Sequence, residues 1–369
     1  MILPAEPLLF TPLYKEKIWG NGRIRTHLGR PLPAGSKIGE SWEISDCGAD
    51  QSIIASGPLS GMTLSRVADE AHDTLIGPAD QAGGFPLLCK FIDAADRLSV
   101  QVHPSDNDAR LNGWGTRGKA ECWFVVDAGP SAHCIAGFNR DTTREEIRSA
   151  LAEGSLATLL ASVPISRGDV LLIPAGTVHA ILGDSLLYEV EEMSDTTLRL
   201  YDWGRVDATG KPRALHIRDA LAVVDTVAAG NRPLPPVTFE TAGCRHSYRT
   251  ACRHFAIEQY SFYRDAEIAV PGRRSFRIVT VVGGGLHLRY SGGKADLPLG
   301  CTALLPAIMG EVHAVGSAGS DILVSWVPDL AEEIVMPLRK QGVSLEAVRA
   351  LGGFGTRNDL SACMEACGR

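Results

Sequence analysis

The segment LSVQVHP, residues 98–104, combines the alternation of a β-strand with side chains that can bind a cation. Successive side chains of a strand point to opposite faces, so Ser99, Gln101 and His103 share one face, and the intervening Leu and Val residues share the other. The apolar face is suited to a hydrophobic core. The polar face needs partners if it is buried, and a bound cation would provide one.

Two further segments can complete such a site. Lys119 and Glu121 stand two residues apart where the strand-like run CWFVVDA begins, and His179 ends the pattern Gly-x5-Pro-x-Gly-x2-His. The sequence therefore offers two imidazoles, one carboxylate and one amide oxygen, from His103, His179, Glu121 and Gln101. This set suits one Zn²⁺ per chain, with Mn²⁺, Co²⁺ or Fe²⁺ as alternatives, and leaves room for water or a substrate.

The other histidines stand outside any such pattern, and we expect them to be ordinary core or surface residues: His27, His72, His133, His216, His246, His254, His287 and His313.

The segments that position these residues are short and rich in β-formers. Glycine and proline turns separate runs such as LSVQVH, CWFVVDA, DVLLIPA, SLLYEVEE, RIVTVVG and DILVSWV. Short strands spaced in this way predict a mainly β protein, as a sandwich or barrel. Helical periodicity is confined to residues 65–77, 141–154 and 216–225 and to the tail after Pro328.

An internal echo predicts two related β-barrels. GDVLLIP at 168–174 returns as GCTALLP at 300–306, and PAGTVHAI is followed by a longer counterpart, PAIMGEVHAV. Chance recurrence in a glycine- and proline-rich chain is the alternative. We expect a metal-binding catalytic domain with a helical insertion at 1–230, a degenerate second barrel at 231–326 and a helical tail at 327–369. The second barrel has no Gln-x-His counterpart and no paired Glu, so we expect it to hold no metal and to serve packing or closure.

Composition excludes several classes of function. The 369 residues carry 36 basic and 43 acidic side chains, a net charge of −7, with no long run of either sign. Nucleic-acid and membrane partners are therefore not expected, since both require clustered Lys and Arg. The longest apolar stretch, 170–183, is shorter than the ~20 residues of a membrane span. The N-terminus has no basic region typical of a secretion signal, and nine cysteines without a CxxC pair indicate reduced thiols in a cytoplasmic protein.

The ordered motifs resemble a known family. The Gly-x5-Pro-x-Gly-x2-His pattern resembles the second cupin motif, with Gly183 where that motif usually has Asn, and Gln101, His103 and Glu121 resemble a stretched first motif. More narrowly, IGESWEIS, FPLLCKFIDAADRLSVQVHPSD, GKAECWFVVDA, LLIPAGTVHAI and LYEVEEMSDTTLRLYDWGR resemble, in order and spacing, the class I (type I) mannose-6-phosphate isomerases, in their short bacterial form. The resemblance is strong over about residues 10–225 and weak over the second barrel.

This resemblance implies roles for individual residues. The family's metal ligands fall on Gln101, His103, Glu121 and His179, and its active-site arginine falls on Arg199. Its sugar- and phosphate-facing positions are matched by Glu40, Lys90, Ser99, Lys119 and Glu189.

Two of these charged positions, Lys90 and Arg199, also have purely structural explanations. Lys90 lies inside the apolar run PLLCKFI, where an unpaired ammonium is costly, so an anionic ligand explains it, but a lysine reaching out from an edge strand is the alternative. Arg199 has the alternative of a structural ion pair with a nearby acid. The acidic neighbours Glu191 and Glu192 are expected to be solvated.

Other motifs carry no function. Gly113-Trp-Gly115-Thr-Arg-Gly118 satisfies GxGxxG, but a strand-like segment follows it, which excludes a dinucleotide site. The chain has no GxSxG and no Walker A sequence, and the glycines at 283–285 predict a tight turn between strands.

The implied function is metal-dependent isomerisation between mannose 6-phosphate and fructose 6-phosphate through an enediol(ate). Arg199 would stabilise developing negative charge, Glu189 is a candidate base, and Lys90, Lys119 and Ser99 would hold the phosphate. One alternative is a Fe²⁺ cupin oxygenase, since two histidines and a carboxylate also suit O₂ chemistry. The other is a non-catalytic phosphosugar-binding cupin. The native metal and the oligomeric state are left open by the sequence.

Overall fold

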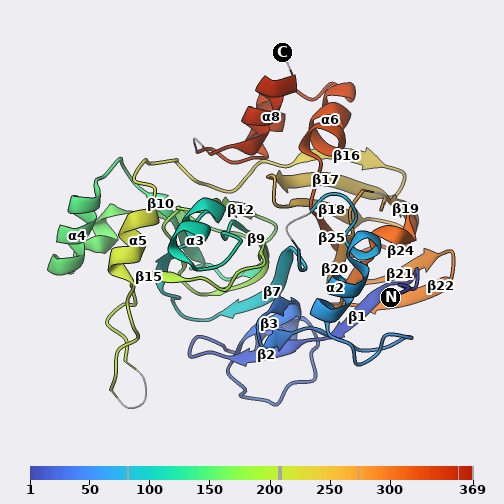
Figure 1. Ribbon diagram of the computed structural model, residues 1–369, viewed down its shortest axis with the longest axis horizontal. Helices are drawn as coiled ribbons and strands as arrows, with labels where there is room; N and C mark the ends of the chain where they lie inside the picture. The colour runs from blue at the N-terminus through green and yellow to red at the C-terminus, as the bar shows by residue number, and fades with distance from the viewer. Residues whose placement is uncertain (81–82, 207–209, 273, 356, 368–369) are drawn as a thin grey trace.

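The computed structural model describes residues 1–80, 83–206, 210–272, 274–355 and 357–367, in which two β-barrels stand side by side with helices at their margins (Figure 1). Neighbouring strands of both barrels pair antiparallel. The predicted mainly β fold with a few helices is confirmed. No helix in these described ranges is long and apolar enough to span a membrane.

Two sheets form the first barrel. In sheet order, the six-stranded sheet consists of β12 (Val170–Ile173), β9 (Glu121–Ala128), β14 (Ser185–Glu192), β7 (Leu87–Ala94), β3 (Ile38–Ile44) and β2 (Leu13–Glu16). The five-stranded sheet consists of β11 (Leu160–Pro164), β10 (His133–Phe138), β13 (His179–Ile181), β8 (Val100–Val102) and β15 (Leu198–Tyr201).

Strand alternation separates the inside of this barrel from its outer packing. On β9 the odd-numbered residues Trp123 and Val125 belong to a core cluster inside the barrel, whereas Cys122 and Phe124 belong to the large core shared with the second barrel. On β8, Val100 and Val102 belong to a third cluster, with the helical insertion, and the polar residues between and beside them face the barrel interior. The alternation read from LSVQVHP therefore describes the folded strand.

The second barrel pairs a larger sheet with a smaller one. The larger has the order β16 (Val237–Thr241), β17 (Cys244–Ala251), β18 (Ala256–Phe262), β25 (Asp321–Trp326), β20 (Arg277–Gly283), β23 (Thr302–Leu305), β1 (Leu8–Thr11) and β6 (Ile53–Ile54). The smaller consists of β19 (Ala266–Val270), β24 (Val312–Gly316), β21 (Gly285–Tyr290) and β22 (Gly293–Pro298), and a separate hairpin joins β4 (Asp46–Cys47) to β5 (Asp50–Gln51). The first strand, β1, therefore lies in a sheet of the second barrel, where Leu8 pairs with Leu304, although the strands that follow it in sequence belong largely to the first barrel.

The internal echo corresponds to equivalent pieces of the two barrels. Gly168 and Gly300 both adopt positive φ, 87° and 77°, at the start of their repeats. In each repeat the following strand lies in the larger sheet and the next strand lies in the smaller one, as β12 and β13 do in the first barrel and β23 and β24 in the second. The predicted turn at 283–285 is present, with Gly284 at φ 62° between β20 and β21.

Helices cover the outside of the barrels. They are α1 (Arg23–His27), α2 (Leu64–Leu75), α3 (Asp106–Asn112), α4 (Arg144–Glu153), α5 (Ile217–Val223), α6 (Met336–Lys340), α7 (Leu345–Ala350) and α8 (Asp359–Cys367), with 3-10 turns at Leu156–Leu159 and Ala307–Met309 and a π-helix at Leu330–Val335. The predicted helices are confirmed. The tail joins the core of the second barrel through residues such as Ile334, Leu338 and Leu351, so it covers a surface that the sheets leave open.

Candidate functional site

The register of the strands brings the candidate residues together. In the five-stranded sheet, Gln101 pairs directly with His179 on one side and with Arg199 on the other. In the six-stranded sheet, Glu189 pairs with Lys90 and Glu191 pairs with Glu121. Directly opposed residues share a face and have Cβ atoms about 4.5–5.5 Å apart. The two sheets therefore direct these side chains into the same barrel from opposite walls.

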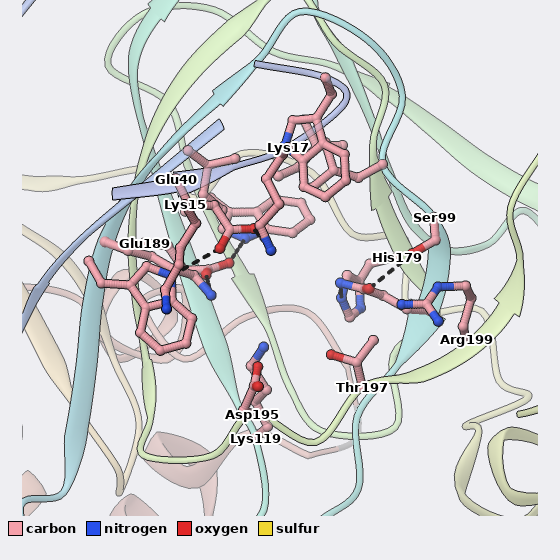
Figure 2. A pocket seen from close by; sticks show the side chains of 18 of the residues that line it. Lys15, Lys17, Glu40, Ser99, Lys119, His179, Glu189, Asp195, Thr197 and Arg199 are labelled. Carbon is pink, nitrogen blue, oxygen red and sulfur yellow. Dashed lines mark hydrogen bonds and ion pairs between the residues drawn. The ribbon is translucent and has the colours of Figure 1, made fainter. Parts of the chain in front are cut away.

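A cavity of about 390 Å³ opens between these walls (Figure 2). Its size falls in the range of small-molecule sites, roughly 300–1,000 Å³. Lysines, arginines and acidic residues together make up much of its lining. In Figure 2 Ser99 and Arg199 lie beside His179, across the cavity from Glu40 and Glu189. The lining residues are Lys15, Lys17, Trp19, Glu40, Trp42, Asp50, Lys90, Ile92, Leu98, Ser99, Gln101, Lys119, Trp123, His179, Ile181, Glu189, Asp195, Thr197, Arg199 and Arg213.

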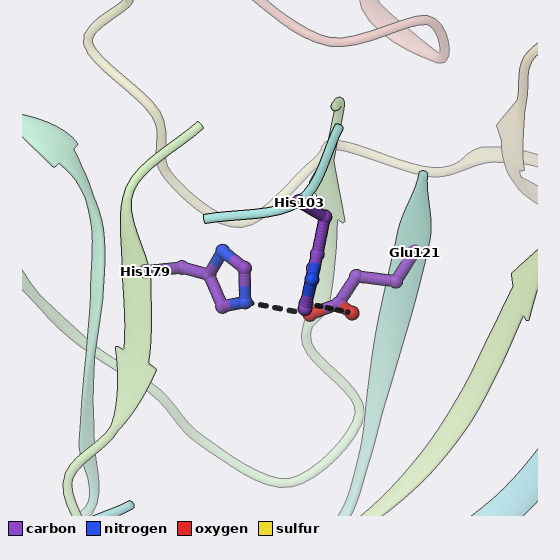
Figure 3. A group of neighbouring side chains, drawn as sticks. All are labelled: His103, Glu121 and His179. Atoms are coloured by element: carbon purple, nitrogen blue, oxygen red, sulfur yellow. Dashed lines mark ion pairs between the residues drawn. The ribbon is translucent and has the colours of Figure 1, made fainter. Parts of the chain in front are cut away.

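Next to the cavity, His103, Glu121 and His179 converge (Figure 3). The Nε2 atom of His103 lies 3.2 Å from one carboxylate oxygen of Glu121, and Nε2 of His179 lies 3.2 Å from the other. All three side chains are about 1% exposed. These ligand atoms lie within 4.8 Å of one another.

Hydrogen bonds on the far side of each ring orient the ligand atoms. Nδ1 of His103 lies 2.8 Å from the carbonyl oxygen of Thr196, and Nδ1 of His179 lies 2.8 Å from that of Thr177. A carbonyl oxygen can only accept, so each Nδ1 donates, and in the neutral ring Nε2 presents a lone pair to Glu121. Among the described residues, neither oxygen of Glu121 accepts a hydrogen bond. The lone pairs of the two imidazoles therefore face those of the Glu121 carboxylate in a buried space, an arrangement that a cation bound between them would satisfy.

Charge states agree with this arrangement. Burial lowers the pKa of His103 to about 3, and the nearby Lys119 adds to the effect. Burial would raise the pKa of Glu121, but His179, Lys119 and His103 outweigh it and hold this pKa well below its usual value. A neutral imidazole and an ionised carboxylate are the forms that bind a metal.

Gln101 lies beside this group. Its amide nitrogen lies 3.3 Å from Nε2 of His179, and its amide oxygen accepts from Ser99 Oγ at 3.3 Å. Rotating this amide by half a turn exchanges nitrogen and oxygen, a choice that hydrogen-bond networks decide. The rotated amide presents an oxygen on the same side as the imidazole lone pair.

Lys90 and Lys119 belong to a buried network of ion pairs. Lys90 Nζ lies 2.7 Å from Glu189 and 3.1 Å from Glu191, and Lys119 Nζ lies 2.9 Å from Glu191. Burial would lower the pKa of Lys90, but Glu189, Glu191 and Glu40 raise it well above its usual value. The partner that the sequence argument sought for Lys90 is therefore supplied by carboxylates of the chain itself.

The expectation that Glu191 and Glu192 are solvated is wrong. Glu191 is 0% exposed and Glu192 is 3% exposed, because β14 is a central strand covered on both faces. Glu191 points into the network of lysines, and burial raises its pKa well above the usual value against the opposing effect of Lys119 and Lys90. Glu192 points the other way, where it accepts from the backbone nitrogen of Ala120 at 2.8 Å and pairs with His254 at 2.9 Å.

Glu189 and Glu40 are each held by a tryptophan. Trp123 Nε1 donates to Glu189 at 2.6 Å, and Trp42 Nε1 donates to Glu40 at 2.9 Å. Glu40 also lies 3.2 Å from Lys17 Nζ. Burial would raise the pKa of Glu40, but Lys90 and Lys17 lower it overall. Both carboxylates thus face the cavity in restrained positions.

Arg199 lies among other arginines. Its guanidinium donates to the carbonyl of Ala214 at 3.0 Å, and no ion pair to Arg199 occurs within the described part of the chain. Burial lowers the pKa of Arg199, and neighbouring Arg213 lowers it further. Arg213 itself lies 3.7 Å from Asp202. A concentration of cations on one wall favours an anionic ligand.

Sequence reasoning missed part of the cavity. Lys15, Lys17, Trp42, Asp195 and Arg213 all line it. Trp42 and Asp195 stand within the motifs IGESWEIS and LYEVEEMSDTTLRLYDWGR but were given no role, and the other three stand outside every motif. The available signal was the spacing of Lys15 on β2 and Lys17 just after it, two residues apart. Arg213 follows a loop after β15, so its position depends on tertiary structure alone.

No cysteine lines the cavity within the part of the chain that the structure describes. The eight cysteines whose side chains are described form no disulfide, and the side chain of Cys367 lies outside that set.

His313, in the second barrel, lies near Glu267 and Glu311 with a side chain that is 45% exposed.

Known proteins resemble the chain along most of its length. A family model described as phosphomannose isomerase type I, catalytic domain, matches residues 8–117. The mannose-6-phosphate isomerase ManA of Bacillus subtilis is 34% identical over 321 residues, which cover 86% of this chain and 98% of that protein. A mannose-6-phosphate isomerase of Streptococcus mutans is 40% identical over 220 residues, covering 60% of this chain and 68% of its own length.

Solved structures share the fold. The mannose 6-phosphate isomerase of Bacillus subtilis matches with a TM-score of 0.79 and 31% identity, over 86% of this chain and 99% of that one. A variant of the Salmonella typhimurium phosphomannose isomerase, at 18% identity and a TM-score of 0.71, shares the fold; the match covers 87% of this chain and 99% of that one. The chain therefore belongs to the type I phosphomannose isomerase family of enzymes.

Proposed function

We propose that this enzyme interconverts mannose 6-phosphate and fructose 6-phosphate with one divalent cation per chain, Zn²⁺ in the first instance. The observation that carries the proposal is the convergence of His103, His179 and Glu121, with their lone pairs directed at one another, beside a cation-lined cavity. Gln101 would add the fourth ligand. The bound cation would supply Lewis-acid polarisation of the sugar oxygens or orient them.

The chain's own residues account for substrate binding. Because Lys90 and Lys119 are committed to buried carboxylates, we place the phosphate against Ser99 and Arg213 instead of against the lysines. An anion there offsets the mutual repulsion of Arg213 and Arg199. Binding energy from the phosphate, which is remote from the reacting carbons, would orient the sugar in the cavity.

The same residues can move the proton. The reaction transfers a proton between C1 and C2 through an enediol(ate), so it needs a base and a positive charge that opposes developing negative charge. Glu189, held by Trp123 and Lys90, is our candidate base. Arg199, which pairs across the sheet with Gln101 and reaches toward His179 in Figure 2, and Lys119, 3.5 Å from Glu121, would stabilise the charge.

The cation-lined wall favours a phosphosugar over the small apolar ligands of an oxygenase. The buried thiols of Cys89, Cys122, Cys134, Cys244 and Cys252, which form no disulfide, support a reducing, cytoplasmic location.

The test is an isomerase assay on mannose 6-phosphate with protein as purified, after chelation, and after addition of Zn²⁺, Mn²⁺, Co²⁺ or Fe²⁺. Fructose 6-phosphate formed only in the presence of metal supports the proposal. Folded, metal-loaded protein without turnover refutes the proposed reaction, and activity that requires both iron and oxygen supports the oxygenase.

A further inference from the structure

Lys119 lies between two carboxylates that stand directly opposite each other. Glu191 on β14 pairs across the sheet with Glu121 on β9. The ammonium of Lys119 lies 2.9 Å from Glu191 and 3.5 Å from Glu121 Oε2. The three side chains are at most 5% exposed.

The unequal distances matter because both carboxylates compete for the same ammonium. Lys119 offers three N–H donors and has no acceptor, and burial obliges those donors to find oxygens. An ammonium that moved onto Glu121 would occupy the oxygen that faces His103 at 3.2 Å. That oxygen belongs to the proposed metal site, and a proton donor on it opposes metal binding.

We propose that Glu191 is a positioning residue that draws the ammonium of Lys119 away from Glu121 and thereby keeps Glu121 free to bind the metal. The inference rests on the proposed metal site. Glu191 needs both carboxylate oxygens for this role, because one oxygen lies 2.9 Å from Lys119 Nζ and the other lies 3.1 Å from Lys90 Nζ. A glutamine in its place offers one acceptor oxygen for two ammonium groups and turns an N–H₂ donor toward the other.

The test measures metal affinity instead of activity. Apoprotein would be titrated with Zn²⁺ in competition with a chromophoric chelator, for the wild type, Glu191→Gln, Lys119→Met and the double variant. Glu191→Gln is expected to weaken zinc binding about tenfold, the scale of loss when a residue that orients a metal ligand is changed. The double variant is expected to regain the affinity of Lys119→Met, because the competing ammonium is gone. A residue that merely supports the fold would not be rescued in this way.

Glu192→Gln is the matched control, since Glu192 is the next residue, is equally buried and points to the opposite face. Its zinc affinity should equal that of the wild type. If Glu191→Gln does not fold, a crystal structure of the zinc-loaded wild type decides, with Lys119 expected to stay on Glu191 and beyond hydrogen-bond distance of Glu121.

Three results overturn the inference. They are wild-type zinc affinity in Glu191→Gln, a double variant as weak as Glu191→Gln, and Lys119 bonded to Glu121 in the zinc-loaded structure. A wild-type protein that binds no zinc refutes the proposed metal site itself, so the two failures are distinguishable.

Discussion

Glu121→Gln should stabilise the metal-free protein and abolish its stabilisation by metal. In the metal-free protein, the Glu121 carboxylate faces two imidazole lone pairs at 3.2 Å and is 1% exposed. A glutamine amide can donate to one of these nitrogens, which adds a hydrogen bond and removes a buried charge at almost unchanged volume.

The magnitude follows from the contacts. One neutral hydrogen bond contributes about 0.5–1.5 kcal/mol, and relieving a buried unsatisfied acceptor contributes about 1–3 kcal/mol. Lys119 loses its weaker contact at 3.5 Å but keeps Glu191. We expect a net gain of about 1–2 kcal/mol, which raises Tm by roughly 1–3 °C for a chain of 369 residues, because the entropy of unfolding grows with chain length. With free zinc at about 100 times its Kd, the wild type gains about 2.7 kcal/mol, whereas the variant gains little.

The assay is thermal denaturation of both proteins with a chelator and with zinc. The expected result is a crossing: the variant melts higher than the wild type without metal and lower with it, and loses isomerase activity. Glu192→Gln is the control, because it breaks the pair with His254 and should melt lower in both conditions. A Glu121→Gln protein that melts lower than the wild type under chelation would refute the reasoning and show that a protonated imidazole pairs with Glu121 when metal is absent.

Further predictions follow from the same geometry. Arg199→Ala should keep its metal, measured by elemental analysis, and lose at least about 100-fold in kcat, on the scale of removing one charge-stabilising donor; full turnover would exclude the catalytic role of Arg199. Arg213→Ala should raise KM for mannose 6-phosphate about tenfold with little change in kcat, because it removes binding shared by ground state and transition state; an unchanged KM would move the phosphate elsewhere. Cys89, Cys134 and Cys252 should resist a thiol reagent at pH 8 until the protein unfolds, because burial raises the pKa of each thiol to about 12 and leaves almost no thiolate. Mass spectrometry identifies the labelled residues, and rapid labelling of any of the three in the native protein would contradict this prediction.

The local sequence was sufficient to predict features that depend only on the periodicity of side chains along a single strand or helix. The alternation in LSVQVHP directs Gln101 to the barrel interior and Val100 to the outer core, because a strand has a period of two whatever it pairs with. The repeated Gly-x5-Pro segments were recognisable because each starts at a glycine with positive φ and leads from a strand of the larger sheet to a strand of the smaller one. The helices at 64–75 and 144–153 follow from their own periodicity and caps.

Tertiary structure decided every feature that depends on which strands become neighbours. Glu191 and Glu192 look like solvated acids in sequence, but β14 became a central strand, so one carboxylate faces two lysines and the other faces His254 of the second barrel. Lys90 gained its counter-charges through the same register. The first strand, Leu8–Thr11, pairs with β23, nearly three hundred residues later.

The physical reason for this division is the range of the interactions. Side-chain direction along a strand is set by the backbone between adjacent residues, so a motif of two or three residues carries it. The ion-pair partners of a buried charge and the residues that line a cavity depend on how strands distant in sequence are aligned with one another. The packing of the whole core determines that alignment. The sequence alone therefore determined the barrel class and the candidate ligands, whereas only the folded chain decided which carboxylate each buried lysine meets.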